Sequence, residues 1–197
     1  MENERADRPI LEMDGRFSLE PLLGRYGARR ARMQPIYEEM LGVARQLADP
    51  RVLHRTFQAD QLPAIASFLP GAEQVVLGLC TLGRRIEDQV GALFADEPGK
   101  AVILDEIANA WVGGLARRLH LTVRAEAQAQ GLQAGPAFRP GIGHWPLSLQ
   151  RDIAQALEAA QVGVSLMESM MLVPEKSISL IIALGHHLGR SSSAPAS

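Results

Sequence analysis

Hydrophobic residues recur most regularly between residues 101 and 131. Five of them lie four positions apart: Ile103, Ile107, Trp111, Leu115 and Leu119. Side chains at this spacing share one face of an α-helix, so the segment predicts a helix of about 30 residues that ends at Gly131. Gly113 and Gly114 interrupt its centre, which indicates either close packing or a place where a ligand approaches the backbone.

Three shorter segments also carry a helical pattern. The first begins with Pro35 in its first turn and closes at Asp49-Pro50, and the second covers residues 84–96 and ends before Pro98-Gly99. The third covers residues 146–161, with Pro146 at its start and its apolar side chains on one face. Proline is favoured in a first turn because its missing N–H has no partner there in any case.

Four segments have the pattern of strands. Residues 51–58 alternate loosely, and Gln74 to Leu82 form an apolar run between Pro70-Gly71 and Gly83, as in a buried strand. Residues 162–169 and 176–185 follow near the C-terminus. Helices and strands mix without regular βαβ alternation, so we expect an α+β fold: a single domain with a mixed or antiparallel sheet and several helices.

The length of 197 residues suits one domain with tails. We expect a charged N-terminal arm over residues 1–31, a folded domain over residues 32–185 and a flexible C-terminal tail over residues 186–197. The arginine-rich segment at residues 25–32 indicates either a solvated arm or a lead-in to the first helix.

Composition excludes several classes of protein. The net charge is −2, whereas nucleic-acid binding normally needs a basic face, so no nucleic-acid partner is expected. No window approaches the ~18 apolar residues of a membrane span, and residues 1–20 lack the apolar core of a secretory signal. The single cysteine, Cys80, lies in an apolar run and is expected to be a buried thiol. We therefore expect a cytoplasmic protein without a membrane partner.

Glycine and proline concentrate in the stretch FRPGIGHWP, residues 138–146. Glycines leave backbone N–H groups uncovered, Arg139 can pair with a carboxylate, and Phe138 or Trp145 can stack on a flat ring. Two interpretations remain open on spacing alone. The stretch is either a ligand-binding loop or a rigid connector whose tryptophan lies in the core.

A second candidate segment contains Glu168 and Ser169, which follow an apolar run and precede methionines. Glu168 can accept hydrogen bonds from a ligand or from the backbone of the next turn. The usual phosphate-binding patterns and the GxSxG nucleophile elbow are absent. His186 and His187 do not predict a metal site, because adjacent residues of a strand point to opposite sides. Asp105 and Glu106 are interpreted as carboxylates near the start of the long helix, where they favour its dipole.

Together, these segments resemble the activation domain of vitamin B12-dependent methionine synthase, in particular its stand-alone versions. The family has a loop of the type R-x-x-P-G-Y-G-D-W-P-L, a helix, then G-[IV]-x-L-T-E-S and a strand of the type [VP]-x-x-S-[VI]-S. The matching loop residues here are Pro140, Gly141, Gly143, Trp145, Pro146 and Leu147. The later matches are Gly163, Val164, Leu166, Glu168, Ser169, Val173, Pro174, Ser177 and Ser179.

The resemblance implies a methyltransferase-associated domain that binds S-adenosylmethionine and assists the reductive re-methylation of a corrinoid protein. It implies a ligand site at Arg139, Pro140, Gly141, Ile142, Gly143, His144, Trp145, Glu168 and Ser169, with no catalytic residue and no metal ligand. The chain has no D-x-H-x-x-G pattern of a cobalamin-binding domain. The expected partners are therefore a separate corrinoid-binding protein or B12-dependent methyltransferase, which would carry the cobalamin, and a flavodoxin- or ferredoxin-type electron donor.

The chain departs from the family pattern at polar positions. The loop arginine falls on Ala137, with Arg139 two positions later, the loop tyrosine is Ile142 and the aspartate is His144. A glutamate of the long helix falls on Gly113. Buried charged ligand groups are costly without polar partners, so two alternatives remain. One is an accessory subunit of a corrinoid-dependent methyltransferase system that has lost the ligand, and the other is a corrinoid or tetrapyrrole protein with His144 as axial ligand.

Overall fold

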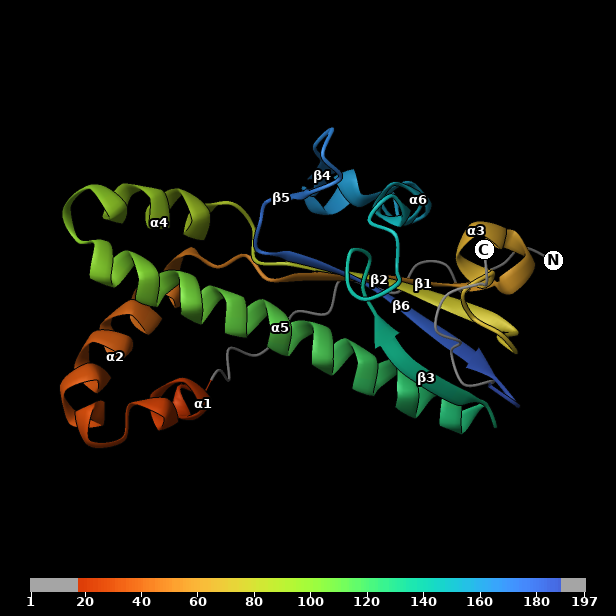
Figure 1. Cartoon of the computed structure of the whole chain (residues 1–197), viewed down its shortest axis with the longest axis horizontal. Helices are drawn as coiled ribbons and strands as arrows, with labels where there is room; N and C mark the ends of the chain where they lie inside the picture. Colours follow the sequence, from red (N-terminus) through yellow and green to blue (C-terminus); the bar gives the residue numbers. More distant parts are fainter. Residues whose placement is uncertain (1–17, 189–197) are drawn as a thin grey trace.

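The computed structural model describes residues 18–188 of the chain. Its centre is an antiparallel sheet with the strand order β1-β2-β6-β3 (Figure 1). The strands are β1 (Arg51–Gln58), β2 (Gln74–Thr81), β6 (Ser177–Gly185) and β3 (Gln133–Phe138). The predicted α+β class is confirmed, with a four-stranded antiparallel sheet as its main sheet and a second, two-stranded sheet formed by β4 and β5.

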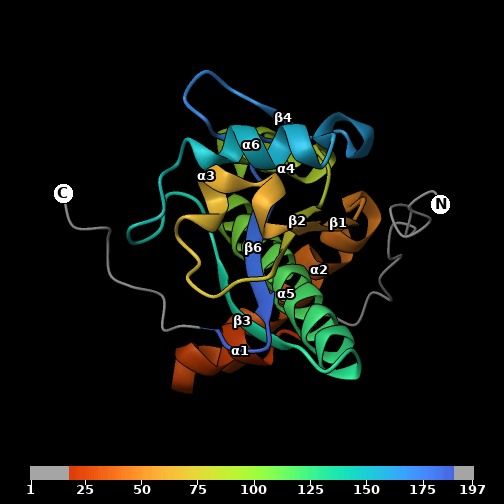
Figure 2. The same ribbon diagram turned by 90° about the vertical axis from the view of Figure 1, so that its right-hand side faces the viewer.

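Helices cover both faces of this sheet (Figure 2). One face carries the long helix α5 (Pro98–Ala129), which packs against α4 (Arg85–Asp96) and α2 (Arg30–Leu47). The short helix α1 (Glu20–Leu23) and the 3-10 helix η1 (Gly24–Arg29) lead into α2. The other face carries the elements η2 (Ala59–Gln61), α3 (Pro63–Ala66), α6 (Leu149–Ala156), η3 (Ala159–Val162) and the hairpin of β4 (Ser165–Leu166) and β5 (Leu172–Val173).

The sheet separates two hydrophobic clusters. Successive strand residues point to opposite faces: Val76 and Cys80 of β2 pack with α5, while Leu77 and Leu79 pack with α3 and α6. Because both faces of β2 are buried, its sequence is a continuous apolar run rather than an alternation of apolar and polar residues. The buried face of α5 includes the five residues of its four-residue repeat.

The long predicted helix is confirmed as α5, which has 32 residues. One proline assignment was wrong, because Pro35 lies inside α2, which begins at Arg30. Pro98 follows the end of α4 at Asp96, as predicted, and it also opens α5. An internal proline removes one helical hydrogen bond, a loss that α2 tolerates because its buried face, including Tyr37 and Met40, packs on α5.

Strand β3 was not predicted. It contains Gly135 and Pro136 and has an irregular register opposite β6 between Ala134 and Ala137. Proline cannot donate to a sheet ladder and is confined to edges and bulges, and β3 lies at the edge of the sheet. The segment therefore has the composition of a loop although it forms a strand.

The C-terminal part of the domain has shorter helices and strands than predicted. The helix expected over residues 146–161 is divided into α6 and η3, with Glu158 between them at a φ of 53°. The strand expected over residues 162–169 shortens to Ser165–Leu166, whereas that at residues 176–185 is confirmed as β6.

The predicted division into arm, domain and tail remains a prediction. Residues 18–31 of the expected arm include α1 and η1, and Leu23 lies in the core with 2% of its surface exposed, in agreement with the lead-in alternative. Residues 1–17 and most of the expected tail lie outside the described residues. None of the helices within residues 18–188 is long and apolar enough to cross a membrane.

Candidate functional site

The loop that follows β3 is closed by three backbone hydrogen bonds. Ile142 N–H donates to the Arg139 carbonyl at 3.2 Å, Trp145 N–H to the Ile142 carbonyl at 3.3 Å, and Gly141 N–H to the Trp145 carbonyl at 2.8 Å. Gly141 and Gly143 have φ values of 82° and 63°, in the left-handed region that favours glycine. The loop is thus a compact turn, and the Gly141 N–H is not free for a ligand.

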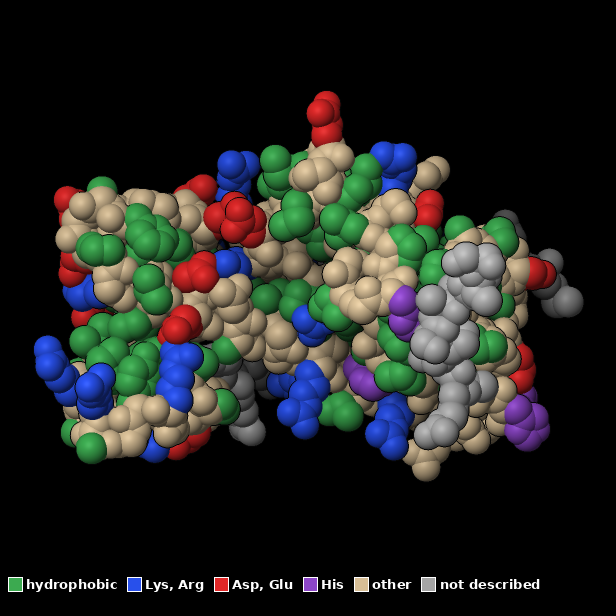
Figure 3. All heavy atoms as spheres, viewed as in Figure 1, with side chains coloured by type: hydrophobic (Ala, Val, Ile, Leu, Met, Phe, Trp, Pro, Cys, Tyr) green, Lys and Arg blue, Asp and Glu red, His purple; other side chains and the backbone are tan. Residues whose placement is uncertain are grey.

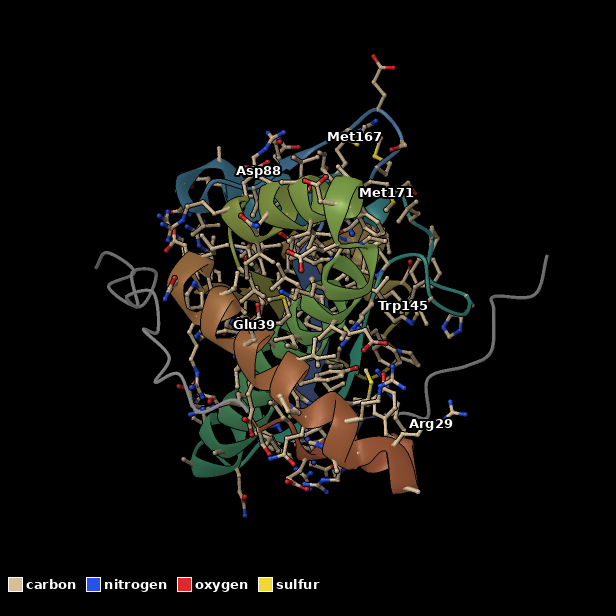
Figure 4. All side chains as sticks on the ribbon, turned by 90° about the vertical axis from the view of Figure 1, so that its left-hand side faces the viewer. Arg29, Glu39, Asp88, Trp145, Met167 and Met171 are labelled. Atoms are coloured by element: carbon tan, nitrogen blue, oxygen red, sulfur yellow. The ribbon has the colours of Figure 1, made fainter. Side chains whose placement is uncertain are left out.

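Trp145 anchors this loop in the core and is 4% exposed. Its ring stacks on Phe138 with centroids 4.6 Å apart and lies 5.2 Å from Phe68. The connector interpretation predicted a core tryptophan, and this is where the ring lies. Pro140 is also buried, whereas Ile142 and Gly143 are exposed at the tip. The loop therefore combines a fixed base with an accessible tip (Figure 4).

Two buried nitrogen atoms at the base of the loop have no hydrogen-bond partner among the described residues: Trp145 Nε1 and His144 Nε2. The His144 ring lies 6.4 Å from Phe68 in a stacked arrangement. Buried polar atoms in native proteins are nearly always paired, with protein groups or with ordered water. The buried His144 Nε2 does not favour the axial-ligand alternative.

Arg139 is half-buried and forms no ion pair or hydrogen bond through its side chain with another residue of the described chain. Its charge acts on the Cys80 thiol: burial raises the pKa of Cys80 to about 12, and Arg139 opposes this increase. Cys80 belongs to the cluster on the α5 face of the sheet. Arg139 is therefore close enough to Cys80 for its charge to act on the thiol.

The strand residues that precede Arg139 lie on opposite faces of the sheet. Ala137 packs against the α5-side cluster and Phe138 against the α6-side cluster. Arg139 directly follows Phe138, the last residue of β3. A basic side chain is thus available at the end of this strand.

Gly113 lies on α5, and a Cβ atom added to it would meet no other atom within 4 Å. The same is true of Gly114. The glycine pair is therefore not required for close packing, which was one of its two predicted roles. Open space at Gly113 fits the alternative role, a helix surface that a ligand can approach.

Glu168 and Ser169 lie at the exposed tip of the β4–β5 hairpin. The turn is closed by Met170 N–H, which donates to the Met167 carbonyl at 3.0 Å, and Met170 has a φ of 66°. The Glu168 side chain accepts no hydrogen bond from the described part of the turn. The turn-capping alternative for Glu168 therefore has no support, and its ligand role remains a prediction.

Exposed apolar side chains gather on the loop and the hairpin. Four residues form what we call the loop–hairpin patch: Ile142 at 60% exposure, Leu147 at 37%, Met167 at 55% and Met171 at 52%. Figure 4 shows Met167, Met171 and Trp145 along the same side of the molecule, and Figure 3 shows apolar side chains around the hairpin. Exposed apolar patches of this kind mark binding surfaces.

Asp105 and Glu106 were wrongly interpreted as carboxylates that act on the helix dipole, because α5 begins at Pro98 and both lie beyond its first turn. Asp105 instead pairs with the buried Lys176 Nζ at 2.6 Å. Glu106 accepts hydrogen bonds from Tyr37 and Arg25. Burial, then the Glu106 contact, raises the pKa of Tyr37. Asp105 therefore links α5 to the residue before β6, and Glu106 links α5 to η1 and α2.

Within residues 18–188, no three His, Cys, Asp or Glu side chains are grouped as metal ligands. His120 Nε2 lies 2.9 Å from the Gly135 carbonyl and connects α5 to β3. His186 Nδ1 lies 2.9 Å from Glu73. Both histidines thus have partners within the fold.

Known protein structures share this architecture. The chain matches the crystal structure of the MetH reactivation domain bound to AdoHcy with a TM-score of 0.63 and 17% identity, over 87% of this chain and 70% of that chain. No protein-family model and no curated protein matches the sequence. The chain therefore has the α+β fold of the MetH reactivation domain.

Proposed function

We propose that the protein is a stand-alone module that binds S-adenosylmethionine and assists the reductive re-methylation of a separate corrinoid protein or B12-dependent methionine synthase. The single observation that carries this proposal is Arg139, which is half-buried and has no ion-pair or hydrogen-bond partner for its side chain among the described residues. A guanidinium without a partner is suited to bind a carboxylate in two parallel hydrogen bonds.

The residues of the proposed site provide contacts for part of S-adenosylmethionine. Arg139 would hold the amino-acid carboxylate, and the loop tip at Ile142 and Gly143 would contact the adenosyl group. The helix position that carries a glutamate in the family is Gly113, so the ammonium lacks that partner. With Arg139 but no carboxylate at position 113, we expect weaker binding than a site with a partner for both the carboxylate and the ammonium would give. When bound, the sulfonium supplies the methyl group, and this chain's part is to position it.

The corrinoid would be carried by the partner, and the loop–hairpin patch is the surface we assign to contact with it. Methionine side chains are flexible and suit apolar surfaces of varied shape. A flavodoxin- or ferredoxin-type protein would supply the electron, and the module would act in the cytoplasm.

Isothermal titration of the protein with S-adenosylmethionine tests the proposal. The expected result is saturable binding of one ligand per chain, with S-adenosylhomocysteine as the neutral comparison ligand. Absence of binding at millimolar S-adenosylmethionine would contradict it.

A second candidate function is supported by the loop–hairpin patch alone. In this case the protein is an accessory subunit that docks on a corrinoid protein of a methyltransferase system without binding the nucleoside. Capture of a purified corrinoid protein that does not depend on S-adenosylmethionine, and that Met171→Glu abolishes, favours this function. Phe94→Glu is the matched control, because Phe94 is 52% exposed on α4, outside the patch.

A further inference from the structure

A cavity of about 450 Å³ lies on the α6 side of the sheet, apart from Arg139 and the loop. It is formed by the end of β1, the segment from η2 into α3, and α6. Figure 2 shows α3 and α6 next to each other on this side, and their Ile65 and Ile153 side chains belong to one core cluster. The volume falls within the roughly 300–1,000 Å³ of small-molecule sites.

The floor and walls of the cavity are mainly apolar. The half-buried Phe57 ring, Leu62 and the buried Ile65 contribute this surface. Their positions are fixed locally: Phe57 is paired with Val75 in the sheet, and Ile65 is 1% exposed. An apolar group of a ligand would therefore meet a preformed surface.

Among the described residues that line the cavity, Asp152 is the only charged one. It is half-buried and forms no ion pair within the described chain. Arg55, a basic residue of β1, lies 3.6 Å from Glu158 and donates to the Ala156 carbonyl at 3.2 Å. Arg55 is thus engaged elsewhere, and the Asp152 carboxylate stays available.

Gln155 and Gln61 add amide groups to the edge of the cavity. The Gln61 side-chain oxygen accepts from the Gln58 N–H at 2.9 Å, which holds this amide in place. One carboxylate and two amides around an apolar floor match a cation with an apolar body, since the ammonium needs both a counter-charge and hydrogen-bond acceptors when it leaves water.

We infer that this cavity is a binding site for a small organic cation, an amine that carries an aromatic or bulky apolar group. The apolar group lies against Phe57 and Ile65, and the ammonium pairs with Asp152. The site is separate from the loop and does not depend on the proposed function. Asp152 also lies in the first turn of α6, where the helix dipole favours a carboxylate, so the test must separate a ligand role from a helix role.

Phenethylamine is the probe, and the uncharged 2-phenylethanol is its matched comparison ligand. In a titration followed by amide NMR signals, phenethylamine is expected to shift the signals of Phe57, Ile65 and Gln155. It should bind at least about tenfold more tightly than the alcohol, which corresponds to about 1.4 kcal/mol. Equal affinity for both compounds, or shifts confined to other residues, would overturn the inference.

Two variants and one control test whether the amine binds in the cavity and pairs with Asp152. Asp152→Asn should remove the preference for the amine, and Asp96→Asn, at an exposed aspartate at the end of α4, should leave it unchanged. Ala64→Trp should fill the cavity and abolish binding of both compounds with the thermal midpoint retained. Unchanged amine binding in Asp152→Asn, or in a folded Ala64→Trp protein, contradicts the site.

Discussion

Among single residues, Gly113 offers the most direct way to change the proposed ligand site. A Cβ atom added here meets no other atom within 4 Å, and glycine costs about 1 kcal/mol relative to alanine inside a helix. Gly113→Glu should therefore fold well and supply a carboxylate to the ligand's ammonium. We expect about tenfold tighter binding of S-adenosylmethionine, measured by titration calorimetry.

Gly114→Glu is the matched control. It has the same open surroundings, gains the same helix propensity and adds the same charge, but it lies on an exposed part of α5. Equal affinity gains in both variants would show that only net charge matters and would remove Gly113 from the site.

The two loop glycines should differ in their tolerance of a side chain. A Cβ at Gly141 lies 3.0 Å from Leu147 Cδ1, whereas one at Gly143 meets nothing within 4 Å. Both have positive φ, which costs roughly 1–2 kcal/mol for other residues. Gly141→Ala should lower the free energy of unfolding by more than Gly143→Ala, by about 1 kcal/mol, in urea denaturation. An equal decrease in the free energy of unfolding in both variants would show that crowding against Leu147 is not important.

The environment of a residue could be predicted from the sequence where it depends on neighbours along the chain. The burial of Cys80 and the glycine-dependent turn at Gly141 both follow from local patterns. The lack of a partner for Arg139 within residues 18–188 could not be predicted, because it depends on which charges the fold brings near. The pairing of Lys176 with Asp105 was missed for the same reason, since the two residues are distant in sequence.

At the scale of elements, the Lys176–Asp105 ion pair links the start of β6 to α5. The Lys176 side chain is 8% exposed and that of Asp105 is 35% exposed. Asp105→Asn leaves a buried ammonium without a counter-charge, which costs about 3 kcal/mol. Lys176→Met leaves a carboxylate that water can reach, so its cost should be clearly smaller. Chemical denaturation of both variants checks this order, and the reverse order would contradict the burial argument.

Elements with a strongly periodic apolar pattern were predictable. Elements that exist only because they pair with a distant strand were not. The repeat of α5 predicts its position to within a few residues, because the buried face of a long helix imposes its spacing on the sequence. Edge strand β3 carries Pro136 and a register shift, so its composition is that of a loop. Only its pairing with β6 makes it a strand, and pairing between distant segments leaves no local pattern.

For the molecule as a whole, Glu73 connects the end of β6 to the segment before β2. The His186 backbone N–H donates to Glu73 Oε1 at 2.8 Å. This hydrogen bond, followed by that of the His186 side chain, lowers the pKa of Glu73 from its usual value of 4.5. A carboxyl group whose pKa is lower in the folded state stabilises the protein above its unfolded pKa, and this contribution is lost as the pH falls through the folded pKa.

Glu73→Gln should therefore have a lower thermal midpoint than the wild type at pH 7, and the difference should shrink as the pH falls below 4.5. Thermal melts followed by circular dichroism between neutral and acid pH measure it. Glu168→Gln, at the exposed hairpin tip, serves as control and should melt like the wild type. A difference that is constant over the whole pH range would contradict the role of Glu73.

The overall fold was predictable from the resemblance of two short segments because glycine-rich loops and buried strands tolerate few substitutions. The ligand and the partner are less determined, since they depend on individual polar side chains rather than on the backbone arrangement. The central claim is that Arg139 binds the carboxylate of S-adenosylmethionine in the proposed ligand site.

Titration calorimetry of S-adenosylmethionine against the wild type and Arg139→Met tests this claim most directly. Methionine retains the length and apolar character of the side chain but removes the charge. The account predicts saturable binding to the wild type and at least about tenfold weaker binding to the variant, which corresponds to about 1.4 kcal/mol. The same affinity in both proteins, or no binding to the wild type at millimolar ligand, would contradict it.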